Sequence, residues 1–241
     1  MTPVLHFVLL TLVALLASTV AAITGFGGAA ILLPALVLAY GTRDAIPILT
    51  VAQLVGNGSR VWFNRKAIKF PVVWWFALGG VPAATIGGIL FARAPLSILT
   101  RGLGVFLILL VVWRHLPSRS MHMPLRGFAL LGAGASFLSA LMGSVGPLMA
   151  PFFLAYGLTK AAYIGTEALT TVVMHVTKLI VYRQSSVLSG HSILAVLSFG
   201  PAMILGSYVG KKVVDRLPER AFIILVEVTL VAAGVLFMVR G

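Results

Sequence analysis

Two glycine-rich stretches occur at corresponding places in the chain, and both have the glycine content of a turn that binds a ligand. They are Gly25-Phe26-Gly27-Gly28 and Gly143-Ser144-Val145-Gly146. Glycine lets the backbone turn sharply, and a helix that begins after such a turn within a membrane leaves its first N–H groups unpaired at the positive end of its dipole. Such a helix start attracts an anion. A lone cluster would more often serve helix packing, but the matched pair predicts one shared anion site.

The second half also carries an acidic residue inside an apolar stretch. Thr171 and His175 follow Glu167 at intervals of one helical turn, so all three share a face. An ionisable group at this depth is costly and is read as functional by default. Glu167 and His175 could relay a proton, or Glu167 could neutralise a nearby cation. The alternative is a carboxylate held by threonine hydroxyls and backbone, which only fixes helix packing.

The corresponding stretch of the first half carries amides in place of the acid. Gln53 and Asn57 lie one turn apart, and Arg60 follows one turn beyond them. The amides either line a pathway or form hydrogen bonds to a neighbouring helix. Lys178, further along the second stretch, could extend its stem to the membrane interface.

These residues sit in a chain whose composition excludes an ordinary soluble protein. Apolar residues make up 60% of the sequence and charged residues 10%, and the apolar residues form runs long enough to cross a bilayer. The net charge of +13 comes from basic residues at the ends of these runs, as in a membrane protein held in one orientation. We therefore expect an integral membrane protein and no nucleic-acid partner.

An internal repeat divides the chain. Leu38-Ala39-Tyr40-Gly41 recurs as Leu154-Ala155-Tyr156-Gly157, each downstream of a glycine-rich break and a proline, and Pro82 to Gly87 recurs as Pro201 to Gly206. Several matches in the same order predict two copies of one unit. The expected boundaries are 1–115 for the first repeat, 116–124 for a linker and 125–241 for the second repeat.

Each repeat contains about five hydrophobic segments, so the expected fold is all-α. The second segment of each is short and follows a glycine break, which is typical of a half-helix within a membrane protein. The expected segments are 4–23, 29–41, 44–63, 71–92 and 96–113, then 127–142, 147–157, 160–182, 191–211 and 219–239.

The distribution of basic residues favours ten crossings. If every segment crosses, twelve basic residues fall on one side, Arg60 among them, and six on the other, Lys178 among them. If each short segment merges with its predecessor, the split becomes ten against eight. Cytoplasmic loops collect positive charge, so the ten-crossing arrangement is preferred. An odd number of crossings per copy makes the two repeats inverted.

Other kinds of chemistry have little support. The chain has no cysteine, its histidines lack metal-ligand spacing, and no nucleophile motif or nucleotide fingerprint is visible. We expect no enzyme activity, no catalytic residues, no metal and no cofactor. The expected partners are a small anionic solute and the lipid bilayer, with a homodimer left open.

The two breaks and their surroundings resemble the sulfite exporter TauE/SafE family. The resemblance rests on Ile23 to Gly28 leading to Pro34, and on Leu141 to Gly146 leading to Pro151, and it covers essentially the whole chain. The second copy departs from the pattern: Pro147 stands where a further glycine is expected, and the copy is one residue shorter before its proline. The resemblance implies transport of small, often sulfur-containing anions across a bacterial inner membrane.

The prediction from sequence is therefore a multi-pass secondary transporter of a small anion. Sulfite, an organosulfonate or a related carboxylate is the expected substrate, with proton coupling through Glu167 and His175. The alternative is a membrane scaffold or assembly protein without transport activity, in which a change such as Gly27→Ala would harm folding and not flux.

Overall fold

Helices make up every regular element in the part of the chain that the structure describes. The computed structural model describes residues 3–26, 28–93, 123–143, 145–186, 190–225 and 228, and no strand occurs among them. The predicted segment 96–113, most of the predicted linker 116–124 and most of the predicted segment 219–239 lie outside the described residues.

The described helices match the predicted segments closely. They are α1 (Pro3–Thr24), α2 (Gly28–Asn64), the 3-10 turn η1 (Arg65–Ala67), α3 (Phe70–Arg93), α5 (Gly127–Met142), α6 (Gly146–Ala155), α7 (Lys160–Gln184) and α8 (Gly190–Arg216). Residues 219–225 are also helical. Long apolar runs bounded by glycine and charged residues set these limits, since a helix satisfies its backbone groups internally in lipid.

Helix α2 contains two arms that meet at Gly41. Gly41 has φ 77° and ψ 162°, which no helix permits, so the predicted segments 29–41 and 44–63 join at a kink. The repeated motif ends in the same way in the second half, where Gly157 follows α6 with φ 90°. Positive φ values favour glycine, and this explains why both copies of the motif end in that residue.

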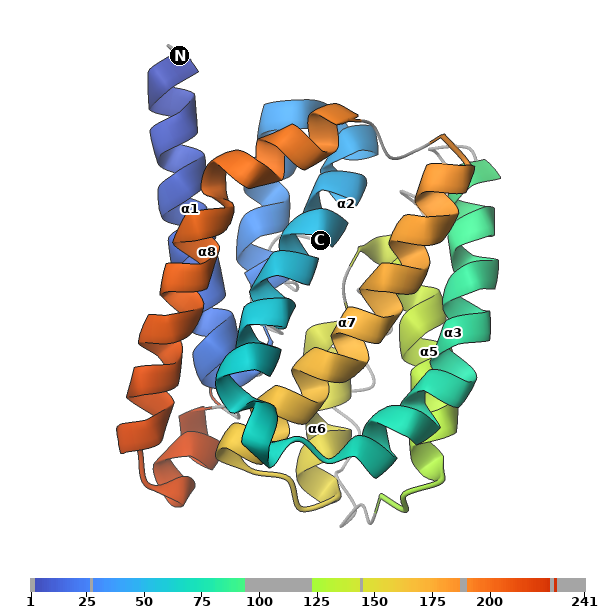
Figure 1. Ribbon diagram of the computed structural model, residues 1–241, viewed down its shortest axis with the longest axis vertical. Helices are drawn as coiled ribbons and strands as arrows, with labels where there is room; N and C mark the ends of the chain where they lie inside the picture. The colour runs from blue at the N-terminus through green and yellow to red at the C-terminus, as the bar shows by residue number, and fades with distance from the viewer. Residues whose placement is uncertain are drawn as a thin grey trace.

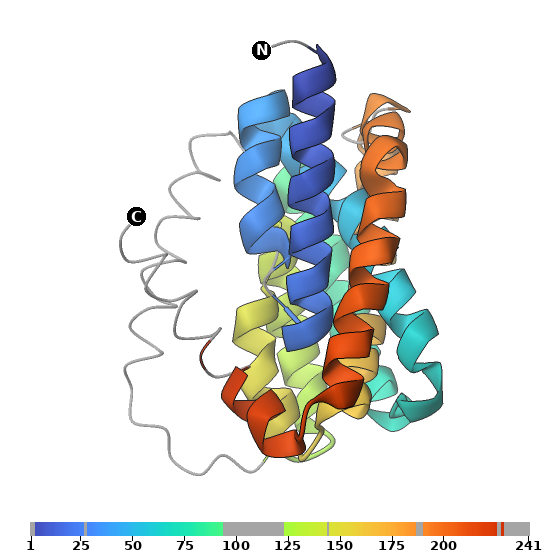
Figure 2. The same ribbon diagram turned by 90° about the vertical axis from the view of Figure 1, so that its left-hand side faces the viewer.

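The helices form a row in which two outer pairs flank two central helices. Helix α1 packs along α8, α3 packs along α5, and α2 and α7 lie between these pairs in contact with each other (Figure 1). In the same view α1, the long arm of α2 and α8 run from top to bottom, whereas α3, α5 and α7 run from bottom to top. Figure 2 shows the short first arm of α2 returning upward beside α1.

Small residues allow each outer pair to pack closely. A Cβ at Gly206 of α8 would lie 2.5 Å from the carbonyl oxygen of Leu15 in α1. A Cβ at Gly87 of α3 would lie 2.9 Å from the carbonyl oxygen of Phe137 in α5. Close backbone approach at glycine is a common way to join helices in a membrane.

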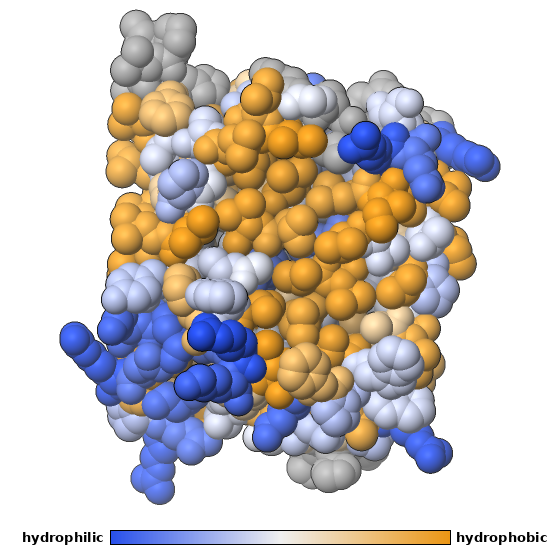
Figure 3. All heavy atoms as spheres, viewed as in Figure 1, coloured by the Kyte–Doolittle hydropathy of each residue, from blue (hydrophilic) through white to orange (hydrophobic). Residues whose placement is uncertain are grey.

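The surface has the polarity of a protein that spans a bilayer. Apolar side chains form a band around the middle of the face in Figure 3, and hydrophilic residues gather toward its two ends. Among the described residues, four helices are long and apolar enough to cross a membrane: Phe7–Thr24, Phe70–Arg93, Lys160–Gln184 and Ile193–Arg216. The chain is thus an all-α, multi-pass membrane protein.

Candidate functional site

The two glycine breaks end their preceding helices with the same geometry. Gly25 has φ 85° and its N–H donates to the carbonyl oxygen of Ala21 at 2.9 Å. Gly143 has φ 88° and its N–H donates to the carbonyl oxygen of Ser139 at 2.9 Å. Each break closes one helix and opens the next within a few residues. The prediction that both stretches interrupt a helix is confirmed for these glycines, whereas Gly27 and Ser144 lie outside the described residues.

The two breaks pack against each other. A Cβ at Gly146 would lie only 2.9 Å from the Cβ of Phe26, so the second break packs directly on the first. Beside this contact lies a pocket with an empty volume of about 310 Å³, which includes its opening. It is lined by Ala21, Gly25, Phe26, Gly28, Gln53, Asn57, Arg60, Val145, Gly146, Met149, Glu167, Thr171 and Met174.

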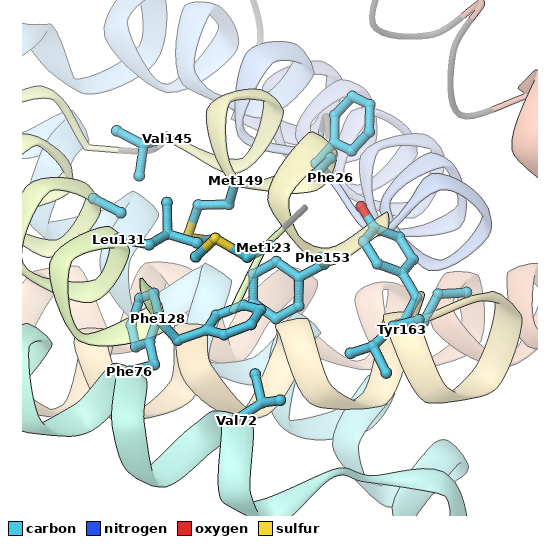
Figure 4. Packing of buried hydrophobic residues seen from close by; sticks show 14 of the residues in the cluster. Phe26, Val72, Phe76, Met123, Phe128, Leu131, Val145, Met149, Phe153 and Tyr163 are labelled. Carbon is cyan, nitrogen blue, oxygen red and sulfur yellow. The ribbon is translucent and has the colours of Figure 1, made fainter. Parts of the chain in front are cut away.

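An apolar cluster supports the breaks from one side. Phe26 and Val145, one from each break, belong to a buried cluster with Met149, Phe153 and Phe128 (Figure 4). The rings of Phe128 and Phe153 meet edge to face at a centroid distance of 5.1 Å. The breaks are irregular in backbone but are set in tightly packed side chains, as irregular backbone at membrane depth requires.

Arg60 provides the principal cation of the pocket. Its Nη1 donates to the carbonyl oxygens of Ala21 at 3.0 Å and Gly25 at 2.6 Å, and its Nη2 donates to Oδ1 of Asn57. The residue is 4% exposed. The charge therefore rests against the carbonyl end of α1, where the helix dipole is negative. Arg60 was counted among the basic residues of one membrane side because it lies in the last turns of an apolar run, but the structure buries it in the pocket.

Glu167 supplies the opposite charge from the other half of the chain. Its Oε2 lies 3.3 Å from Nη1 of Arg60, and its Oε1 accepts a hydrogen bond from Oγ1 of Thr171 at 3.0 Å. Both charged side chains are buried, so the pair is shielded from water. Of the alternatives for Glu167, the observed contacts match neutralisation of a nearby cation together with support from a threonine hydroxyl.

Lys178 is buried against the second break. Its Nζ donates to the carbonyl oxygen and the hydroxyl of Ser139, both at 3.1 Å, and to the carbonyl oxygen of Gly143 at 3.3 Å. With no exposed surface, it does not extend to the membrane interface, so that expectation was wrong. Arg60 and Lys178 were counted on opposite sides of the membrane, and removing one from each side leaves the asymmetry of basic residues in place.

The other predicted site residues divide into two groups. Gln53, Asn57 and Thr171 all line the pocket, as do Phe26 and Gly28. His175 is buried but does not line it, and neither of its ring nitrogens has a hydrogen-bond partner. No hydrogen bond joins His175 to Glu167 among those of the described residues.

Sequence reasoning missed Tyr163. Its ring packs on Gly25 so closely that a Cβ there would lie 2.5 Å from the tyrosine Oη. Tyr163 stands one turn before Glu167 on α7, and this spacing was the available signal. The contact explains why only glycine fits at position 25.

A second pocket adjoins the first on the side of α1 and α8. It has an empty volume of about 260 Å³ and shares Ala21, Gly28, Gln53 and Arg60 with the first pocket. Ser207 lines it with a buried hydroxyl that has no hydrogen-bond partner, and Nε of Arg60 also lacks one. Arg60 thus stands between two small spaces.

The arrangement suits binding of an anion better than covalent chemistry. Within the described residues no three histidine, aspartate or glutamate side chains gather as they would around a metal. The site brings together a guanidinium, its partner carboxylate, two helix starts, and amide and hydroxyl side chains around one pocket.

Comparison with known proteins agrees with the resemblance noted in the sequence. No curated protein and no solved structure matched the chain. The family model described as "Sulfite exporter TauE/SafE" matches residues 10–237, which is nearly the full length. The match includes both glycine breaks, both buried cations and Glu167. The chain therefore belongs to the sulfite exporter TauE/SafE family.

Proposed function

We propose that the chain is a secondary transporter that carries a small anion through the pocket between the two glycine breaks. The family is described as sulfite exporters, which makes the chain a membrane transporter rather than an enzyme. Within that class the proposed substrate is sulfite, an organosulfonate or a related sulfur-containing or carboxylate anion. The proposed location is a bacterial inner membrane.

One observation carries the proposal: both breaks and an Arg60–Glu167 ion pair enclose a single pocket between the halves. Gly28 and Gly146 are the first residues of α2 and α6, and both line it. Two helix starts and a guanidinium that face one space favour negative charge there. A protein that only packed helices at these glycines would have no need of buried charges beside them.

We also propose that residues 1–115 and 125–241 are inverted repeats. Corresponding helices run in opposite directions in Figure 1: α1 runs downward and α5 upward, and α3 runs upward and α8 downward. Helix α3, the fourth predicted segment of the first half, packs on α5, the first segment of the second half. In the same way α8, the fourth predicted segment of the second half, packs on α1. Inverted repeats with broken helices place a substrate site between two halves that rock about it.

Proton coupling would act through the ion pair. While Glu167 is ionised, it neutralises Arg60 and competes with an anion for the guanidinium. A proton on Glu167 would cancel the carboxylate charge and leave Arg60 free to attract the anion. The Oγ1 of Thr171 would keep the neutral side chain in place. Proton and anion would then move in the same direction, with Glu167 as the coupling group.

Flux into proteoliposomes tests the proposal. Purified protein should take up radiolabelled sulfite or a small organosulfonate, and an imposed pH gradient should drive accumulation. Glu167→Gln mimics the protonated residue, so this variant should lose proton-driven accumulation and keep counterflow. Glu219→Gln, at an exposed position, is the matched control and should behave as wild type.

Two results would contradict the proposal separately. Absence of sulfite and sulfonate flux under every gradient would remove the substrate class. If proton-driven uptake by Glu167→Gln is unchanged, the proposed transport of the anion still holds, but Glu167 is not the coupling group.

A further inference from the structure

The two buried cations occupy equivalent positions in the two halves. Arg60 binds the carbonyl oxygens of residues 39 and 35 positions before it, at the end of α1. Lys178 binds the carbonyl oxygens of residues 39 and 35 positions before it, at the end of α5. The same spacing and the same kind of acceptor make Lys178 the counterpart of Arg60.

The halves differ in how these cations are neutralised. Arg60 is paired with Glu167, whereas all three hydrogen-bond acceptors of Lys178 are uncharged. No described carboxylate forms an ion pair with Lys178. The negative end of the α5 dipole offsets only about half of an elementary charge. Among the described residues, the charge of Lys178 is therefore only partly offset beside the second break.

Leu49 explains the difference. Leu49 precedes Arg60 by the same number of residues as Glu167 precedes Lys178, so it is the counterpart of Glu167. It is fully buried, and its Cδ2 lies 3.3 Å from where a Cβ at Gly143 would stand. The position from which a carboxylate could neutralise Lys178 thus holds an apolar side chain.

Lys178 lies close enough to the pocket for its charge to act there. Met174, one helical turn before Lys178 on α7, lines the pocket. Gly143, whose oxygen accepts from Lys178, stands just before Val145 and Gly146, which also line it. One turn of helix is about 5.4 Å, and charges at such separations interact strongly when water is excluded.

We propose that Lys178 is a second resident cation of the site, whose charge raises the affinity of the pocket for an anion. The inference rests on the proposed function and deepens it. Arg60 has Glu167 as its partner, whereas Lys178 has no described carboxylate partner, so the charge of Lys178 adds to the attraction of the pocket for an anion. Lys178 does not touch the ligand, because its donors are occupied by Ser139 and Gly143. It sets the potential in which the ligand binds.

A matched pair of substitutions at position 49 provides the test. Binding of radiolabelled sulfite and isethionate, a small organosulfonate with one negative charge, is measured on purified protein. Leu49→Glu places a carboxylate beside Lys178 and should weaken binding of both by about tenfold or more. Leu49→Gln has nearly the same shape without the charge and should remain within about threefold of wild type.

Substitutions of Lys178 itself supply a second readout. Lys178→Arg keeps the charge and should bind nearly as wild type, whereas Lys178→Met should lose affinity as Leu49→Glu does. Thermal unfolding of each variant shows which variants are folded. If Lys178→Met does not fold, the comparison of Leu49→Glu with Leu49→Gln tests the role of the Lys178 charge.

The outcomes separate this inference from the function on which it rests. If Leu49→Glu binds both anions as wild type does, or if Leu49→Gln loses as much affinity as Leu49→Glu, the role of Lys178 is overturned. The proposed function would still stand. Wild-type protein that binds neither anion would overturn the proposed function, and the inference with it.

Discussion

Nη1 of Arg60 lies 3.3 Å from Oε2 of Glu167, and this ion pair joins two residues that are 107 positions apart in the sequence. Arg60 comes from the long arm of α2 and Glu167 from α7, so the pair links the two halves at their central contact. The same guanidinium binds the carbonyl end of α1 at Gly25. One side chain thus connects the first break, the opposite half and the pocket.

Breaking this pair from one side should be costly. Arg60→Met leaves Glu167 buried without its partner and should lower the free energy of unfolding by about 3–5 kcal/mol. The double variant Arg60→Met/Glu167→Leu should lose less than the sum of the single changes, with a coupling of about 1–3 kcal/mol. Unfolding in mixed micelles measures all three variants.

The Lys211–Asp215 pair is the control for this double-mutant cycle of two single variants and one double variant. It joins residues one turn apart on α8, and Asp215 is half exposed. Such pairs contribute only about 0.3–0.5 kcal/mol, so the same cycle there should give a small coupling. Equal coupling at the two pairs would contradict the view that the buried pair holds the halves together.

Gly25 should not tolerate alanine. Its φ of 85° disfavours any residue with a Cβ, and the added methyl group would meet the ring of Tyr163. We expect Gly25→Ala to lower the free energy of unfolding by about 2 kcal/mol or more. Gly58→Ala, in the long arm of α2, meets nothing within 4 Å and should be neutral or stabilising by up to about 1 kcal/mol. A Gly25→Ala variant as stable as Gly58→Ala would refute the close packing of Tyr163.

Gly206 should be essential for the contact between α1 and α8. Gly206→Val would push its side chain into the backbone of α1 near Leu15 and should lower the thermal unfolding midpoint in detergent. Gly134→Val is the control, because a Cβ at Gly134 on α5 meets nothing within 4 Å. A similar loss in both variants would indicate that the cost is helix propensity and not packing.

The sequence predicts the helices and the breaks well for a physical reason. Membrane crossing demands long apolar runs, and sharp turns inside a membrane demand glycine. The breaks at Gly25 and Gly143 can therefore be recognised from the sequence. The equal positions of the motifs ending in Gly41 and Gly157 then indicate the repeat. Gln53, Asn57 and Thr171 could be singled out from the sequence because polar groups on one face of an apolar helix need a shared environment.

The buried cations were missed because composition alone does not locate a charge. Arg60 and Lys178 each end an apolar run, where long basic side chains usually extend to the membrane interface. Their burial depends on the carbonyl groups that the glycine breaks leave unpaired, and this partnership joins distant parts of the chain. The equal separation of Arg60 from Gly25 and of Lys178 from Gly143 was visible in the sequence and would have revealed it.

Protection of single cysteines by substrate tests most directly whether the two breaks enclose one anion site. The chain has no cysteine, so Gln53→Cys and Met174→Cys each place one thiol in the pocket, from the first and the second half. Ser185→Cys, exposed at the end of α7, is the control. A negatively charged methanethiosulfonate reagent is applied with and without isethionate. We predict that isethionate slows labelling at positions 53 and 174 alike and leaves position 185 unaffected. Protection of only one pocket position, or of none, would contradict a single site shared by both breaks.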